Sequence, residues 1–180
     1  AQLTSLMGAK LSAQGEEKGG VIQVGGQLQG GELPTSDLYL WAQQQFVGLP
    51  QTFSSEKTWV NSSSTLEAQA SRGQGGLIVV WSDDVTSMQG QINAYGLISG
   101  GLVEVSGKNT LASVHLDAIT LGPGGQLLLD PKNITIGNHD DAYQWLMLSL
   151  FISGYKDYDL INVQDYYGTG HAVALSDNAK

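Results

Sequence analysis

Gly75-Gly76-Leu77-Ile78-Val79-Val80 joins two glycines to four residues that favour β-strands, and this arrangement occurs four times in the chain. The other copies are Gly19-Gly20-Val21-Ile22-Gln23-Val24, Gly100-Gly101-Leu102-Val103-Glu104-Val105 and Gly124-Gly125-Gln126-Leu127-Leu128-Leu129. Their first glycines are separated by 56, 25 and 24 residues. A repeat of about 25 residues therefore organises much of the chain, and the first interval spans about two units.

A second short stretch of alternating residues precedes each glycine pair, at 9–13, 65–70, 91–95 and 114–118. One set of positions in these stretches holds Leu11, Leu66, Ile92 and Leu116. Two residues later, each stretch has an alanine: Ala13, Ala68, Ala94 and Ala118. Alternation with a period of two places both sets on one face of the strands. We therefore predict an inward-facing column that contains Leu66, Ile92 and Leu116.

The repeat unit is too small to bury its own inner face, so neighbouring units must bury it for each other. A third strand is expected at 84–88 and at 109–113. Units stacked about 4.8 Å apart would align the leucine positions inside the stack. The sequence thus predicts an all-β solenoid over residues 1–136. A sandwich of hairpins is the alternative, but the chain has no Asn-Gly or Asp-Gly turn.

Residues 32–57 interrupt the repeat. They have poor periodicity, two prolines (Pro34 and Pro50) and four aromatic residues: Tyr39, Trp41, Phe46 and Phe53. We interpret the segment as an insertion that forms a hairpin or a loop on the side of the stack. Exposed aromatic faces can stack on sugars or protein partners, so these four residues are the candidate ligand contacts. The alternative is that they anchor the insertion to the solenoid, since large aromatic side chains are usually well buried.

After Ile136 the pattern changes, and residues 137–160 are expected to form a capping segment. Asp140-Asp141 precede a run of good helix formers, and Gly154 follows it, which predicts a helix over 141–152. Its expected role is to cover the open end of the stack, with Trp145, Leu148 and Ile152 facing inward. A buried pair of strands is the alternative.

Charge and composition exclude several classes of protein. Eight basic and 17 acidic residues give a formal net charge of −9, which disfavours binding to nucleic acid or to anionic membranes. The absence of cysteine excludes disulfides and thiolate zinc sites. The longest apolar run, 145–152, is far shorter than the roughly 20 residues that span a bilayer. Any export signal is expected upstream of Ala1.

No catalytic cluster is evident in the sequence. The outward positions of the repeat hold Gln, Asn, Ser and isolated Glu or Lys, whereas β-helical lyases gather carboxylates and basic groups on one face. Asp83-Asp84 could offer oxygen ligands to calcium, but adjacent carboxylates in a turn are usually solvated. His115, His139 and His171 lack metal-ligand spacing. We therefore expect no enzyme activity, metal or cofactor.

Five stretches between residues 8 and 136 are similar in sequence to a known protein family. They are 19–26 with Gln29-Gly30, Leu33-Pro34, Val79-Val80-Trp81-Ser82-Asp83, 101–108, and 127–136 with Asp130-Pro131-Lys132-Asn133 at its centre. These stretches resemble the filamentous-haemagglutinin-like exoproteins of two-partner secretion systems, and the last two are the more specific. The resemblance implies a right-handed parallel β-helix that an outer-membrane transporter partner carries to the bacterial surface. The insertion at 32–57 departs from the family pattern.

The C-terminal residues carry a second resemblance. Residues 165–177, which include Tyr167-Gly168 in place of the usual Phe-Gly, resemble the start of an FG-GAP, integrin-like propeller repeat. This resemblance implies that a further module begins within 161–180.

Together these patterns predict a structural segment of a secreted or surface-displayed bacterial adhesin that acts in adhesion, aggregation or biofilm. Its receptor would be a glycan or protein of the host cell or matrix. A self-polymerising extracellular filament subunit is the first alternative, and a polysaccharide lyase or hydrolase is a distant one.

Overall fold

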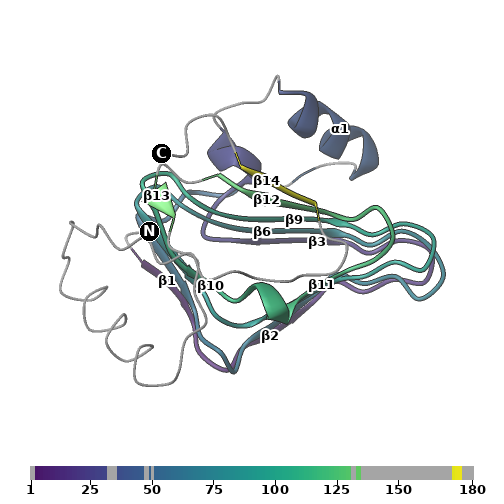
Figure 1. Cartoon of the computed structure of the whole chain (residues 1–180), viewed down its shortest axis with the longest axis horizontal. Coiled ribbons are helices and arrows are strands. Elements are labelled where there is room, and N and C mark those ends of the chain that lie inside the picture. Colours follow the sequence, from purple (N-terminus) through teal and green to yellow (C-terminus); the bar gives the residue numbers. More distant parts are fainter. Residues whose placement is uncertain are drawn as a thin grey trace.

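The computed structural model describes residues 3–31, 36–46, 49, 51–130, 133–134 and 172–175, the last two ranges by their backbone alone. This part of the chain is mostly β-structure, with three parallel sheets and one α-helix (Figure 1). The observed class agrees with the prediction of a fold built from parallel strands.

Each sheet contains strands that lie far apart in the sequence. The first sheet consists of β1 (Leu3–Leu6), β4 (Lys57–Val60), β7 (Val85–Met88), β10 (Thr110–Val114) and β13 (Asn133–Ile134). The second consists of β2 (Lys10–Ser12), β5 (Thr65–Glu67), β8 (Gln91–Ala94) and β11 (Ile119–Leu121). The third consists of β3 (Val21–Val24), β6 (Leu77–Ser82), β9 (Leu102–Gly107), β12 (Gln126–Leu129) and β14 (Ala172–Leu175). The helices within the described residues are η1 (Leu28–Gly31), α1 (Asp37–Gln45) and η2 (Leu116–Ala118).

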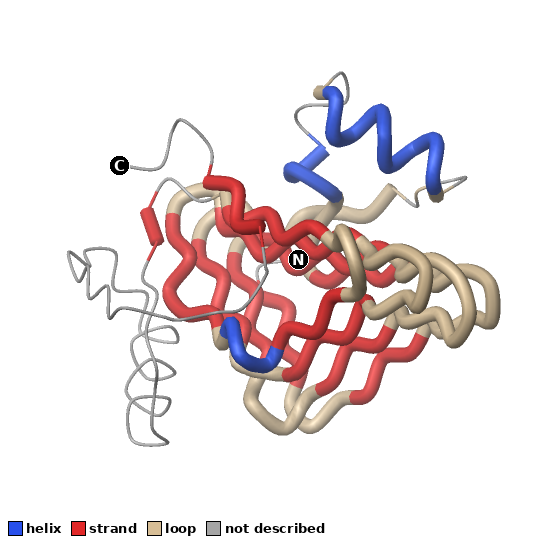
Figure 2. The backbone as a smooth tube through the Cα atoms, turned by 45° about the vertical axis from the view of Figure 1, so that its right-hand side comes forward, coloured by secondary structure: helices blue, strands red, loops and turns tan. Residues whose placement is uncertain are grey.

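From β1 to β12 the chain visits the three sheets in a fixed order, and we call one passage through all three a circuit. The first circuit is β1, β2 and β3, and three more follow it. Strands of successive circuits lie side by side and pair in parallel (Figures 1 and 2). Strands β7 and β10 occupy the positions predicted for a third strand, which confirms three strands per repeat.

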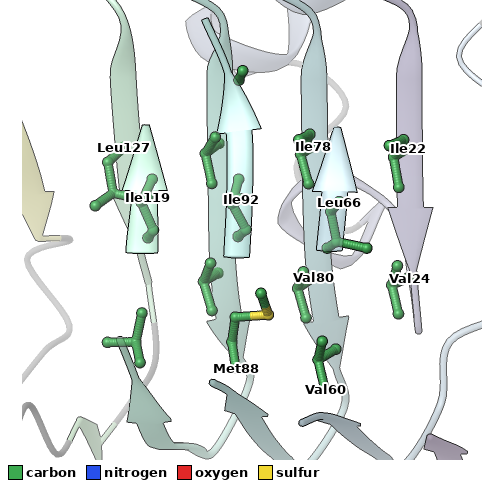
Figure 3. Packing of buried hydrophobic residues seen from close by; sticks show 14 of the residues in the cluster. Ile22, Val24, Val60, Leu66, Ile78, Val80, Met88, Ile92, Ile119 and Leu127 are labelled. Atoms are coloured by element: carbon green, nitrogen blue, oxygen red, sulfur yellow. The ribbon is translucent and has the colours of Figure 1, made fainter. Parts of the chain in front are cut away.

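The inner faces of the three sheets enclose an apolar core. In the second sheet, Leu11 is in register with Leu66, and Leu66 with Ile92. Leu66 and Ile92 are fully buried and face the strands of the third sheet (Figure 3). The predicted column is therefore confirmed for these positions, as is the burial of Ala68 and Ala94 two residues further along.

The prediction that Leu116 continues this column is wrong. Ile119, not Leu116, is in register with Ile92 (Figure 3). Leu121 is in register with Ala94 and occupies the place predicted for Ala118. Leu116 lies in η2 and is only partly buried. The last circuit is thus shifted by three residues relative to the pattern read from the sequence.

Local changes in length explain this shift. Strand β10 contains a bulge between Leu111 and Ser113, which adds one residue to the strand. The corner between β10 and β11 holds η2, and the connection from β11 to β12 is shorter than the one from β8 to β9. The residues added before β11 and the residues lost after it nearly cancel. The last two glycine pairs therefore remain 24 residues apart, although the register of β11 has changed.

The glycine pairs permit close stacking of successive circuits. A Cβ atom on Gly75 would lie 1.9 Å from the backbone oxygen of Ala94, and one on Gly101 would lie 2.0 Å from that of Gly76. Neither glycine has a positive φ. The backbone of a neighbouring circuit, the next one for Gly75 and the preceding one for Gly101, therefore requires glycine at these positions, rather than a left-handed turn.

The interval of 56 residues between the first two glycine pairs contains one circuit, not two. Strand β3 pairs directly with β6, and Ile22 is in register with Ile78. The additional residues lie between β3 and β4 and include η1 and α1, so they begin before the segment 32–57 predicted from the sequence. From here on, the insertion means residues 25–56. A hairpin or a loop was predicted here, and the helix was not.

The expected capping helix at 141–152, with Trp145, Leu148 and Ile152, lies outside the described residues. The same holds for most of the segment 161–180. Within that segment the structure places β14 beside β12, with Ala172 in register with Gln126.

Candidate functional site

The outward face of the third sheet is apolar, and the insertion covers it (Figure 1). The sheet contributes Leu77, Val79, Trp81 and Leu102, and the insertion contributes Leu28, Tyr39, Ala42 and Phe46. All of these side chains are buried. The third sheet is consequently covered on both faces, which explains why β6 and β9 are buried along their whole length, whereas burial alternates along β8 of the second sheet.

Helix α1 begins at a well-formed N-cap. The hydroxyl of Ser36 accepts a hydrogen bond from the backbone N–H of Tyr39 at 3.1 Å, and Asp37 lies in the first turn, where the helix dipole favours a negative charge. The hydroxyl of Ser36 also donates to the side-chain oxygen of Gln29 at 2.5 Å. The start of α1 is therefore tied to the turn that precedes it.

The structure separates the four predicted ligand-contact residues. Tyr39 and Phe46 are 8% and 5% exposed and pack between α1 and the third sheet. Trp41 is partly buried and meets Phe46 edge-to-face, with ring centroids 6.4 Å apart. Phe53 is 95% exposed. Tyr39 and Phe46 thus anchor the insertion, whereas Trp41 is partly accessible and Phe53 is almost fully accessible to a partner.

Lys18, in the connection between β2 and β3, contacts the C-terminal end of α1. Its ammonium nitrogen lies 4.8 Å from the centroid of the Phe46 ring and donates a hydrogen bond to the backbone oxygen of Gln45. A cation near the C-terminus of a helix is stabilising, and a cation–π contact adds to it.

A buried carboxyl group, Glu104, lies on the same outward face of the third sheet. Its neighbours in register are Val79 on β6 and Leu128 on β12, and its side chain is 0% exposed. Oε2 accepts a hydrogen bond from the backbone N–H of Gln29 at 2.8 Å. Oε1 has no hydrogen-bond partner among the described residues.

The turn that contacts Glu104 has an unusual backbone. Gln29 has φ 52° and Gly30 has φ 64°, so a non-glycine residue adopts a left-handed conformation. Among the described residues Gln29 is the sole non-glycine residue with positive φ. Its N–H points at Glu104, and we interpret the carboxyl group as the partner that holds this turn against the sheet.

Burial raises the pKa of Glu104 from its ordinary value of 4.5 to about 8. The N–H of Gln29 and the hydroxyl of Ser106 favour the charged form and lower the pKa by less, while the nearby Asp130 raises it slightly. Glu104 is therefore mostly protonated at neutral pH in the folded protein.

This raised pKa predicts that stability falls as the pH rises. Between pH 4.5 and about 8 the unfolded chain has lost the proton of Glu104 and the folded chain has kept it. The free energy of unfolding should then fall by up to about 1.4 kcal/mol per pH unit in this window. Glu104→Gln keeps an oxygen for the Gln29 N–H and should remove this contribution.

Urea unfolding at pH 5, 6, 7 and 8 measures the effect. The matched control is Glu56→Gln, because Glu56 is exposed. A Glu104→Gln variant that retains the full decline of the unmodified chain would contradict the assignment.

Glu104 was not predicted as a site residue, although the sequence contains a signal for it. The residue interrupts the apolar run Leu102-Val103-Glu104-Val105, and the aligned positions in two other repeats hold Val79 and Leu128. A charged residue at an apolar repeat position indicates a special environment. The insertion that buries it could not be placed over this strand from sequence alone.

The other candidates considered in the sequence lie apart from this site. Asp83 accepts a hydrogen bond from the indole N–H of Trp81 at 3.2 Å, and Asp84 accepts one from the side chain of Asn109 at 3.0 Å. His115 is exposed next to η2. Across the described ranges, no three His, Asp or Glu side chains come together in a way that could hold a metal ion.

No family model, curated protein or solved structure matches the chain. Within the described part of the chain, none of the helices has the length and hydrophobicity needed to cross a membrane.

Proposed function

We propose that the chain is a right-handed parallel β-solenoid segment of a secreted or surface-displayed bacterial adhesin, with a mechanical and adhesive role rather than a catalytic one. In this proposal the segment serves adhesion, aggregation or biofilm formation. An outer-membrane transporter partner exports it, and a host-cell or matrix glycan or protein is its receptor.

One observation carries the proposal: each circuit adds one strand to each of three parallel sheets. Such a fold grows along a single axis, by about 4.8 Å per circuit, and every added circuit buries the face of the one before. Length can then increase without any change in the design of the core. This property suits a shaft that holds a binding surface away from the cell. Circuits that form one after another also suit a chain exported from one end.

Electron micrographs and the mass in solution of the purified chain test this proposal. Separate short particles with the mass of one chain support a shaft segment. Long fibres would replace it with the self-polymerising filament subunit. Incubation with a panel of polysaccharides should release no new reducing ends or unsaturated products, and their appearance would favour the lyase alternative.

Within this function, we assign receptor contact to the insertion, with Phe53 and Trp41 as the contact residues. If beads coated with the chain bind cells or matrix, Phe53→Ala should weaken binding by about 1–2 kcal/mol, as for an aromatic residue at a contact, and leave the melting temperature unchanged. Ile98→Ala, which removes an exposed apolar side chain in the connection between β8 and β9, outside the insertion, is the matched control. Binding that survives both Phe53→Ala and Trp41→Ala would move the contact away from the insertion.

A further inference from the structure

The outward face of the second sheet contains a hollow of about 260 Å³, which we call the second-sheet groove. It is lined by Thr65, Leu66, Glu67, Gln91, Ile92, Asn93, Asp117, Ala118 and Thr120. Leu66 and Ile92 also belong to the inner core, so the outward polar side chains of their strands determine the chemistry of the groove. Glu104 and the sheet face that α1 covers belong to the third sheet, so the groove is separate from both.

The groove coincides with the irregular part of the repeat. Asp117 and Ala118, which line it, belong to η2, and Thr120 belongs to the strand whose register differs from the predicted one. The repeat predicted a strand at the sequence positions that form η2, and the strand of this circuit, β11, begins only after η2. The irregular corner therefore provides the wall of the hollow, and departures from a repeat are often functional.

Two of the lining side chains are held in place by neighbours. The carboxylate of Glu67 lies 3.1 Å from the ammonium nitrogen of Lys10 through Oε2. The side-chain amide of Asn93 donates to Gln69 at 2.6 Å and accepts from the backbone N–H of Tyr95 at 3.0 Å. These fixed groups lose little freedom on ligand binding, which favours affinity.

Other polar groups of the groove are available to a ligand. Thr65, Gln91, Asp117 and Thr120 form no side-chain hydrogen bond or ion pair with the rest of the described chain. Gln91 and Thr120 are exposed, as is Asp117. The set offers two hydroxyl groups, one amide and one carboxylate, so it can both donate and accept hydrogen bonds within one small volume.

The charge of the groove selects among ligand classes. Lys10 neutralises Glu67, and Asp117 contributes a negative charge, so phosphate, sulfate and uronate groups are disfavoured. A ligand rich in hydroxyl groups fits the mixture of donors and acceptors. The volume lies just below the usual range of small-molecule pockets, which corresponds to one or two sugar rings.

We propose that the second-sheet groove binds a neutral saccharide through Thr65, Gln91, Asp117 and Thr120. This site is separate from the receptor contact assigned to the insertion. Its test does not depend on whether the adhesin proposal is correct.

Titration of the isotopically labelled chain with lactose, cellobiose and N,N′-diacetylchitobiose, followed by NMR, tests the proposal. At least one of these neutral sugars should shift the side-chain amide signals of Gln91 and Asn93 at millimolar concentrations or below. Glucuronic acid should bind more weakly than the neutral probes. Glucosamine tests whether an amine is the preferred ligand.

Substitutions locate the binding. Gln91→Ala should weaken it about 3- to 10-fold, the value expected for the loss of one or two hydrogen bonds. Gln126→Ala, which makes the same change at an exposed position of the third sheet, should leave the affinity unchanged. Thr120→Trp, which fills the groove, should abolish binding, and it provides a second test if Gln91→Ala does not fold.

Two results would overturn the proposal. One is the absence of any shift at Gln91 and Asn93 with all three neutral sugars. The other is a response to glucosamine alone, which would make the groove a site for amines.

Discussion

Replacing Ile92 by Asp is expected to prevent the chain from folding at 25 °C. Ile92 is 1% exposed and lies between Leu66 and Ile119 in the inner column of the second sheet (Figure 3). A carboxylate at this position would be buried without a partner, which costs several kcal/mol. Because the free energy of unfolding of a domain is only about 5–15 kcal/mol, one such group is enough to remove most of it.

Far-ultraviolet circular dichroism and thermal melting measure this outcome. Gln91→Asp, which introduces the same residue at the neighbouring exposed position of β8, is the control and should melt within a few degrees of the unmodified chain. Ile92→Asp should show no cooperative transition. A cooperative melt in that variant would mean that Ile92 does not face the core.

The inner column was predictable because it follows directly from the repeat. Leu11, Leu66 and Ile92 share one phase, and alternation with a period of two assigns them to one face. Leu116 shares the same phase in sequence but not in space. A bulge and a corner helix changed the register, and neither has a strong sequence signal. Ile119-Thr120-Leu121, a second alternating stretch in the opposite phase, pairs with β8 instead of the predicted stretch.

The candidate site was less predictable because it depends on contacts between distant segments. Glu104 lies 75 residues from Gln29 in the sequence, yet in the folded chain the backbone N–H of Gln29 donates a hydrogen bond to the buried Glu104 side chain. The helix that covers the sheet begins at Ser36-Asp37, a recognisable N-cap, but α1 has little amphipathic pattern because its outward face includes Leu40. Local patterns therefore revealed the strands better than the insertion.

Gly101→Ala is expected to destabilise the chain by about 3 kcal/mol or more, through overpacking against backbone atoms. The added Cβ would lie 2.0 Å from the oxygen of Gly76, and that oxygen accepts the hydrogen bond that joins Leu102 to the preceding circuit at 3.0 Å. Backbone atoms cannot rotate away as the end of a side chain can. The two circuits must separate locally, and this hydrogen bond weakens with them.

Gly20→Ala is the decisive comparison, since Gly20 occupies the same position of the repeat in the first circuit. Its Cβ would lie 3.1 Å from the Cβ and 3.2 Å from the backbone oxygen of Ala13, in the same circuit, and neither Gly20 nor Gly101 has a positive φ. The free energy of unfolding in urea should therefore change by no more than about 1 kcal/mol in Gly20→Ala. Equal losses in the two variants would mean that the glycines serve the conformation of the turn. A large loss confined to Gly101→Ala would assign them to the close approach of stacked circuits, because stacking is the feature that distinguishes the two positions.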